Sequence, residues 1–301
     1  MQNTDSDGKS LSFQEIIKTW TERLIKAQIP KAEWSVNKIV AHILGKKDKQ
    51  GVDMKSVPTE TTLSKIEEMC GERLKGTPVP FILGQCDFLD MTLLMKQPVL
   101  IPRPETEEFA KIIIKEWPFD QEREVKVLEV GCGAGVLAVY ILHKLPNVKC
   151  VAMDISKPSC ELTMDNAKRY NLQDRIEVIH GDILTDSVVS ELSQRGPYDV
   201  VLSNPPYLTT EEISELDNEI VQFEDHDALF GGNDGLDVVR KVIVESGKFF
   251  KDENSVILLK VGSWLTERIK TFLEERSDLR LSYTDKGSAG RVQFCQMKLI
   301  K

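Results

Sequence analysis

Apolar side chains recur at helical spacing in three stretches near the start of the chain. The stretches cover residues 13–24, 36–44 and 63–74, and in each the apolar positions fall on one face of a helix. Gly45 follows the second stretch and is a typical helix-ending residue. Since no strand pattern interrupts them, these stretches predict a small helical bundle over residues 1–85.

The pattern changes to short extended segments at residue 86. The segments "FLDMTLLM" (88–95) and "PVLIPR" (98–103) are brief and apolar. They predict two short strands, paired as a β-hairpin, in a linker that covers residues 86–105.

From residue 106 to residue 301, predicted strands alternate with predicted helices. Five apolar runs are typical of buried strands: 125–130, 148–154, 175–182, 198–204 and 255–261. Helices are expected to fill the gaps, including 236–250 and 264–275, and a closing hairpin is expected from 279–284 and 291–299. This alternation predicts an α/β domain with a mostly parallel, seven-stranded sheet covered on both faces.

Composition and charge narrow the classes of protein that this chain can be. Lys and Arg number 39 against 48 Asp and Glu, a net charge of -9. Broad nucleic-acid binders are usually basic, so direct nucleic-acid binding is not expected. No apolar run approaches the length of a membrane span, so no membrane partner is expected. The six cysteines form no C-x-x-C pair, which predicts no metal site and suits a reducing compartment.

A glycine-rich loop, "LEVGCGAGVLA" (128–138), follows the first strand of the predicted sheet. Gly131, Gly133 and Gly135 have the spacing G-x-G-x-G, and Val136 follows, so the dinucleotide pattern G-x-G-x-x-G is not met. Glycine lets the backbone turn sharply and approach a ligand closely. A tight strand–helix turn that binds nothing is the alternative.

Three acidic residues stand at or near the carboxyl ends of consecutive strands: Glu129, Asp154 and Asp182. Open α/β sheets bind their ligands at this edge. An acidic edge suits a cofactor with ribose hydroxyls and an amino group but no pyrophosphate, which describes S-adenosyl-methionine. For each acid, a solvated strand end is the alternative.

The fourth strand ends in "NPPY" (204–207), beside the first strand and at the same edge. An amide or aromatic-amine nitrogen is a poor nucleophile because its lone pair is conjugated. Its N–H bonds can be held by two acceptors, the side-chain oxygen of Asn204 and the backbone carbonyl of Pro205, which proline rigidity keeps oriented. Tyr207 can stack on the flat substrate group. These residues predict methyl transfer to a planar nitrogen.

Several segments then resemble one family. "NPPY" resembles the signature of class I, Rossmann-like methyltransferases acting on planar nitrogens. "LIPRPETEE" (100–108), "FEDHDALFGGNDGL" (223–236) and "IVAHILG" (39–45) resemble blocks of the HemK/PrmC family. That family methylates the glutamine N5 in the Gly-Gly-Gln loop of peptide-chain release factors, converting S-adenosyl-methionine to S-adenosyl-homocysteine.

The resemblance implies a role for each matching residue. Catalysis is assigned to Asn204, Pro205 and Tyr207. The cofactor is assigned to Glu129, Gly131, Cys132, Gly133, Ala134, Gly135, Asp154, Asp182, Ile183 and Asn204. The glutamine side chain is assigned to Asn204, Pro205, Pro206 and Tyr207, with Arg103, Glu105 and Thr106 beside them. The helical domain (1–85) is implied to contact the release factor, and residues 106–301 to form the methyltransferase domain.

The chain departs from the family at Lys260, where members often carry glutamate. Likeness to the animal branch implies a mitochondrial protein, otherwise a cytoplasmic one, although residues 1–10 have neither a secretory apolar core nor the arginines of a transit peptide. A monomer is the default expectation. Two other functions stay open: adenine-N6 methylation of DNA or RNA, which shares "NPPY", and a non-enzymatic adaptor.

Overall fold

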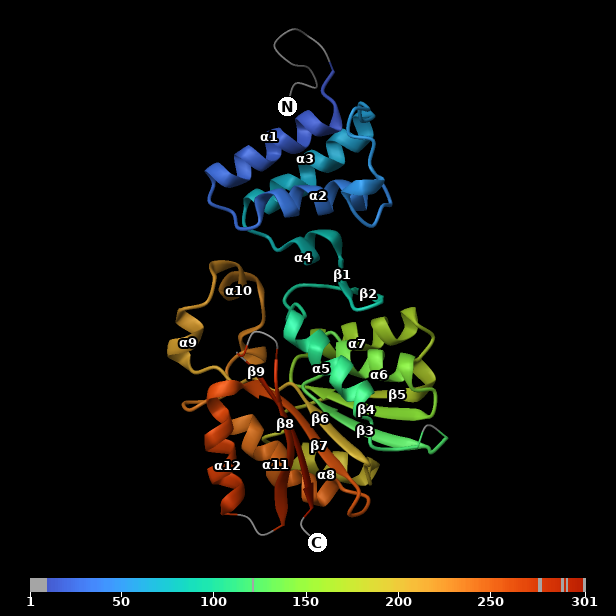
Figure 1. Cartoon of the computed structure of the whole chain (residues 1–301), viewed down its shortest axis with the longest axis vertical. Helices are drawn as coiled ribbons and strands as arrows, with labels where there is room; N and C mark the ends of the chain where they lie inside the picture. The colour runs from blue at the N-terminus through green and yellow to red at the C-terminus, as the bar shows by residue number, and fades with distance from the viewer. Residues whose placement is uncertain (1–9, 121, 276–277, 288–289, 291, 300–301) are drawn as a thin grey trace. The chain divides into compact units, whose positions relative to one another are not determined.

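The structure is a computed structural model that describes residues 10–120, 122–275, 278–287, 290 and 292–299. The chain forms two compact units, which divide between Cys86 and Asp87 (Figure 1).

The first unit is helical, as the apolar stripes predict. Its elements are α1 (Phe13–Lys26), α2 (Ala32–Ile43), the 3-10 helix η1 (Lys49–Gly51), α3 (Glu60–Leu74) and α4 (Val79–Leu83). At the start of α1, the Ser12 side chain accepts a hydrogen bond from the Glu15 backbone, and the Glu15 carboxylate accepts one from the Ser12 backbone. This reciprocal cap fixes where the helix begins. The apolar faces of α1, α2 and α3 pack into one core around Ile16, Ile39 and Ile66, each fully buried.

The predicted hairpin is present but lies earlier than expected. Strand β1 (Gln85–Phe88) pairs with β2 (Met91–Leu94). The segment 98–103 was predicted as the second strand, and this prediction is wrong, because it has no regular structure. Its two prolines cannot donate to a ladder, and the backbone N–H of Ile101 is bonded to the Glu224 carboxylate at 3.0 Å.

The second unit is built on a seven-stranded sheet with the order β5-β4-β3-β6-β7-β9-β8. Its strands are β3 (Val125–Val130), β4 (Val148–Asp154), β5 (Ile176–His180), β6 (Val200–Ser203), β7 (Val256–Gly262), β8 (Leu279–Lys286) and β9 (Val292–Leu299). The pairs from β5 to β7 are parallel, and β9 pairs with β7 and β8 in antiparallel fashion. The mostly parallel sheet and the closing hairpin are therefore confirmed. The third strand ends at His180 rather than at Asp182 as predicted, so Asp182 lies in a loop.

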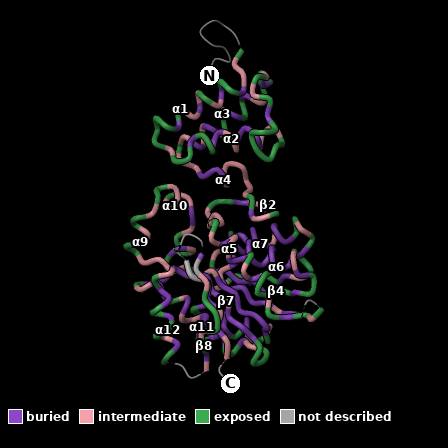
Figure 2. The backbone as a smooth tube through the Cα atoms, in the orientation of Figure 1, coloured by how far each residue is buried: buried purple, intermediate pink, exposed green. Residues whose placement is uncertain are grey.

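Helices cover both faces of this sheet (Figure 1). Helices α5 (Pro104–Lys115), α6 (Val136–Lys144) and α7 (Lys157–Arg169) cover one face, and α8 (Asp186–Arg195), α11 (Asp237–Phe249) and α12 (Thr266–Glu274) cover the other. The remaining elements are α9 (Thr210–Ser214), α10 (Asn218–Phe223), η2 (Gln173–Arg175), η3 (His226–Ala228) and η4 (Ser263–Leu265). The inner strands are buried along most of their length (Figure 2) because both faces are covered. Within the described residues, no helix is long and apolar enough to cross a membrane.

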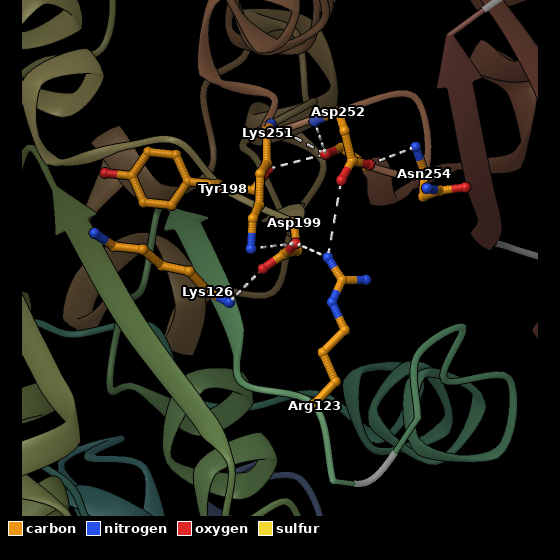
Figure 3. Close-up of polar contacts among 8 residues, drawn as sticks. Arg123, Lys126, Tyr198, Asp199, Lys251, Asp252 and Asn254 are labelled. Atoms are coloured by element: carbon orange, nitrogen blue, oxygen red, sulfur yellow. Dashed lines mark hydrogen bonds and ion pairs between the residues drawn. The ribbon is translucent and has the colours of Figure 1, made fainter.

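The amino-terminal edge of β6 is anchored by one buried carboxylate (Figure 3). Asp199 is 1% exposed and accepts hydrogen bonds from the Lys126 backbone at 2.8 Å and from the Arg123 guanidinium at 2.5 Å. The Lys251 ammonium lies 3.6 Å away. These contacts lock β3 to β6 at one end, while the chemistry predicted from the sequence lies at the opposite, carboxyl end of the same strands.

Candidate active site

The glycine loop between β3 and α6 has a backbone that other residues rarely adopt. Gly131, Gly133 and Gly135 have φ values of +77°, +55° and +74°. At Gly135 an added Cβ would also lie 2.9 Å from Thr163 Cγ2, so both conformation and space require glycine there. The N–H groups of Gly131 and Cys132 both donate to the Met153 carbonyl, at 2.9 and 3.0 Å. The loop is thereby held against the end of β4.

Asp154, the last residue of β4, fixes this loop from the other side. Its Oδ2 accepts a hydrogen bond from the Gly133 backbone at 2.8 Å, and its Oδ1 accepts one from Ser156 at 2.9 Å. The residue is 8% exposed, and this burial raises the pKa of its carboxyl although both backbone bonds oppose the shift. The carboxylate is thus rigidly oriented before any ligand arrives.

Glu129 lies deeper, beneath the loop. It is 1% exposed, and its Oε2 accepts a hydrogen bond from the Ala138 backbone, in the first turn of α6, at 3.1 Å. Burial raises the pKa of this carboxyl well above its usual range. The side chain lies at the amino-terminal end of α6, where the positive end of the helix dipole stabilises the charged form of the carboxyl.

Asp182 closes the acidic rim from the loop after β5. Its Oδ1 accepts a hydrogen bond from the Leu184 backbone at 2.8 Å, which shapes a tight turn. The neighbouring Ile183 is 5% exposed and packs into the core around β3 and β4. The turn therefore presents a carboxylate and an apolar wall side by side.

Residues 204–207 form a corner after β6, and the glycines of the segment 223–236 support it. An added Cβ at Gly231 would lie 2.6 Å from Tyr207 Cα, and one at Gly235 would lie 2.4 Å from the Tyr207 carbonyl oxygen. The Gly231 N–H also donates to the Leu208 carbonyl at 2.9 Å. Only a chain without side chains at these points can pass so close, so the two segments define each other's position.

Lys260, on the neighbouring strand β7, reaches the same corner. Its Nζ donates a hydrogen bond to Asn204 Oδ1 at 3.1 Å and lies 5.5 Å from the centroid of the Tyr207 ring. It is 3% exposed, and burial lowers the pKa of its ammonium to about 8. The Trp264 ring meets the Tyr207 ring edge-on at 6.0 Å. The corner is therefore braced by one cation and one aromatic ring.

Arg103, which precedes α5, and Glu105 and Thr106, in the first turn of α5, have separate positions in the structure. Thr106 is 3% exposed and lines the cavity described below. The Arg103 guanidinium instead contacts both carboxylate oxygens of Glu224 at 2.9 Å, and Arg103 is not among the residues that line this cavity. Glu105 acts on Tyr207 and Lys260 at longer range: burial raises the pKa of Tyr207 and the Glu105 charge adds to that rise, whereas burial lowers the pKa of Lys260 and the Glu105 charge opposes that fall.

A cavity of about 230 Å³ gathers most of the predicted residues. Its lining includes Glu129, Gly131, Cys132, Gly133, Ala134, Asp154, Asp182, Ile183, Asn204, Pro205, Pro206 and Thr106. Gly135, Tyr207 and Arg103 do not line it; Gly135 caps α6, and Tyr207 packs against the hydrophobic core of the second unit. The lining also includes residues to which the sequence assigned no role, among them Ile155, Ala228 and Phe230. Ala228 and Phe230 belong to the block 223–236, and the resemblance of that block to the family was the signal for this part of the wall.

The chemistry of the lining suits a nucleoside with a positively charged group. Asp154 and Asp182 offer acceptors for hydroxyl and amino groups, and Ile155 and Ile183 offer apolar surface. Among the described residues that line the cavity there is no Lys, Arg or His, so a pyrophosphate would meet no cation. Within the described ranges, no three His, Cys, Asp or Glu side chains are grouped to hold a metal ion.

Known proteins share both units of the chain. The profile of the PrmC N-terminal domain matches residues 15–84, and that of the methyltransferase small domain matches residues 108–226. Human MTRF1L release factor glutamine methyltransferase is 36% identical over 289 residues, which are 93% of this chain and 84% of the human protein. This chain belongs to the HemK/PrmC family. The resemblance that its motifs indicated is confirmed.

Bacterial members of the HemK/PrmC family are similar over comparable lengths. The release factor glutamine methyltransferase of Streptococcus pneumoniae is 34% identical and covers 73% of this chain and 76% of its own length. That of Bradyrhizobium diazoefficiens is 30% identical, with 87% and 86% covered. The chain is thus an S-adenosyl-methionine-dependent methyltransferase with a class I fold, and the predictions of fold class and cofactor are confirmed. The roles of the individual site residues stay predictions.

Proposed function

We propose that this methyltransferase acts on the side-chain N5 of the glutamine in the Gly-Gly-Gln loop of a peptide-chain release factor. The observation that carries the proposal is the shared cavity: Asn204 and Pro205 line it together with Asp154 and the glycine loop. A nitrogen held by the corner would therefore lie next to a cofactor held by the loop. The names of the human and bacterial relatives support a release factor as the substrate.

The residues of the chain divide the work. Asp154 and Asp182 would bind the ribose hydroxyls and the adenine edge of the cofactor, and the glycine loop would approach its methionine part. The bound cofactor supplies a methyl group on a positively charged sulfur. Asn204 and the Pro205 carbonyl would orient the glutamine amide, so that its nitrogen faces the methyl group. The nitrogen would gain that methyl group as the cofactor sulfur gives it up, and would then release one proton to water.

The corner needs little reorganisation for this task. Two consecutive prolines fix their own φ angles, and the Gly231 and Gly235 contacts fix the backbone from behind. Preorganised dipoles stabilise a transition state more than mobile ones, because no free energy is spent on ordering them during the reaction. We therefore expect orientation of the substrate amide by this rigid corner to supply most of the rate acceleration.

The test is to incubate the full chain with methyl-labelled cofactor and one of three substrates: a release factor, the same factor with its loop glutamine changed to alanine, or DNA and RNA. Label on the first substrate alone, located on the glutamine by mass spectrometry, is the expected result. Label on adenine would establish the alternative reaction instead, and label on none of them would leave an adaptor as the better interpretation.

We also propose a cellular compartment for this protein. Similarity to the human relative over 93% of this chain supports a place among the animal proteins, for which we propose mitochondria. Imaging of the tagged full-length protein in its own cells tests this, and an exclusively cytosolic signal would contradict it.

A further inference from the structure

The two-stranded hairpin is held by side chains of α7 and of its C-cap residue rather than by a third strand. The Asn166 carboxamide accepts a hydrogen bond from the Leu94 backbone N–H at 2.7 Å and donates one to the Leu94 carbonyl at 3.1 Å. One turn later, the Tyr170 hydroxyl accepts a hydrogen bond from the Thr92 N–H at 2.8 Å and donates one to the Thr92 carbonyl at 2.9 Å. Because alternate residues of a strand present their backbone groups to the same edge, the two side chains dock one edge of β2 onto α7.

The same Asn166 side chain also holds the glycine loop. Its Nδ2 donates a further hydrogen bond to the Ala134 carbonyl at 2.9 Å. The Thr163 hydroxyl, one turn earlier on α7, donates one to the Gly133 carbonyl at 2.9 Å. Asn166 and Thr163 are both fully buried, and Ala134 lines the cofactor cavity. Since each peptide unit is planar, the two α7 side chains set the orientation of two successive peptide planes in the cavity wall.

Three partners fix which end of the Asn166 carboxamide faces which group. The amino group has two N–H donors, and both are used, one for the Leu94 carbonyl and one for the Ala134 carbonyl. A carboxamide that turned over would set its oxygen against two carbonyls and its amino group against the Leu94 N–H. The hairpin contacts and the loop contact therefore depend on one rigid planar group in one orientation.

We propose that Asn166 is a positioning residue for the cofactor, which couples the docking of the β1–β2 hairpin to the shape of the glycine loop. While β2 is docked, Leu94 holds the carboxamide in the orientation that also supports the Ala134 carbonyl. When β2 moves away, the carboxamide can rotate and the loop loses this support. The division between the two units falls within β1, so the hairpin belongs to the covalent link between them. The inference concerns the cofactor and does not depend on which substrate is methylated.

The first test uses the reciprocity of such a coupling in the full chain. If a docked hairpin favours the cofactor, a bound cofactor must favour the docked hairpin to the same extent. Saturating S-adenosyl-homocysteine should therefore slow hydrogen exchange of the Thr92 and Leu94 backbone amides by about threefold or more, as measured by NMR. In Asn166→Leu, the cofactor should no longer slow exchange at Thr92. Exchange that the cofactor leaves unchanged in the wild type would overturn the proposal.

The second test is a double-mutant cycle on the Kd of S-adenosyl-homocysteine, measured by calorimetry. Tyr170→Phe removes the hydroxyl that docks Thr92 and leaves Asn166 intact, and should raise the Kd by about threefold. Asn166→Leu should raise it by about tenfold, the usual effect of losing one buried hydrogen bond. In the double variant, Tyr170→Phe should add nothing, because the hairpin then has no link to the loop. Lys168→Leu, at an exposed lysine of α7, is the control and should keep the wild-type Kd.

The outcomes distinguish coupling from a purely structural role. An Asn166→Leu variant with a lower thermal stability and an unchanged Kd would show that Asn166 only supports the fold, and would overturn the proposal. A Tyr170→Phe effect that is absent, or that is equal in both backgrounds, would overturn it as well. If Asn166→Leu does not fold, the wild-type exchange rates and the Kd of Tyr170→Phe still decide the question.

Discussion

At the scale of single residues, the site depends on polar groups whose partners are fixed before a ligand binds. Asp154 has one backbone N–H on each carboxylate oxygen, and Asn204 has the Lys260 ammonium on its oxygen. Each bond restricts a rotation that the substrate or the cofactor would otherwise have to stop. The geometry of the site thus depends on the groups that hold Asp154 and Asn204 in place as much as on these two side chains themselves.

Asn204→Ala should lower kcat by at least about 100-fold, the usual effect of removing one oriented polar group from a transition state. The fold should persist, because the backbone at this corner is held by prolines and by packing against Gly231 and Gly235. Initial rates with the release factor, together with circular dichroism, check both statements. Asn254→Ala, at an exposed turn on the opposite edge of the sheet (Figure 3), is the matched control. Near-parental activity in Asn204→Ala would refute the role of this residue.

Lys260→Met should raise the free energy of unfolding at pH 7. The pKa of Lys260 is lowered from the usual 10.5 to about 8, so the unfolded chain binds the proton more tightly than the folded one. A shift of this size opposes folding by about 3 kcal/mol below pH 8, and the penalty disappears as the pH rises to 10.5. Allowing for the lost hydrogen bond, we expect a gain of about 1–2 kcal/mol at pH 7 that shrinks above pH 8. Urea unfolding from pH 7 to 10 measures it, and a gain that does not change with pH would contradict the explanation.

At the scale of elements, a buried ion pair links the segment before α5 to the end of α10. The Glu224 side chain is 2% exposed and is held by the Arg103 guanidinium and the Ile101 N–H. Burial raises the pKa of the Glu224 carboxyl, and the charge of Arg103 opposes that shift. Arg103 therefore has a structural task, whether or not it also meets the substrate.

Arg103→Met should destabilise the fold by about 2 kcal/mol at pH 7, less than for a fully buried pair because Arg103 is 32% exposed. Without Arg103 the pKa of Glu224 rises further above its unfolded value. The folded state then holds the proton more tightly, and the lost stability returns as the pH falls through the raised folded pKa. The double variant Arg103→Met/Glu224→Gln should recover most of the loss at pH 7. Chemical denaturation at pH 5 and 7 measures these effects, and an equal loss in all variants at both values would contradict them.

At the scale of the whole molecule, the helical unit has a groove of its own. Trp34 is 48% exposed and lines this groove together with Ile25, which is 62% exposed, and with Lys31 and Lys49. Exposed tryptophan is rare on an isolated surface and common at protein interfaces. We therefore propose that the helical unit recognises the release factor through this groove, as the family resemblance implied, at a surface away from the glutamine loop.

Trp34→Ala should raise the KM for the intact release factor by about tenfold, the usual loss at a central aromatic contact. The KM for a short Gly-Gly-Gln peptide should not change, because such a peptide is too short to engage a second surface. Val57→Ala, at another exposed apolar residue of the same unit that does not line the groove, is the control. Equal changes for the peptide and the intact factor would count against a separate recognition surface.

The sequence by itself determined the features that depend on neighbours along the chain. Helical and strand spacing predicted the bundle, the parallel strands and the closing hairpin, and local motifs predicted the glycine loop, the acidic edge and the proline corner. Tertiary structure decided which distant groups meet. The register of β6 and β7 brings Lys260 into hydrogen-bond distance of Asn204, and Arg103 forms an ion pair with Glu224. Residues 98–103 have no strand partner. These outcomes follow from packing and strand order, because two side chains far apart in sequence become partners only when the sheet and its loops are assembled.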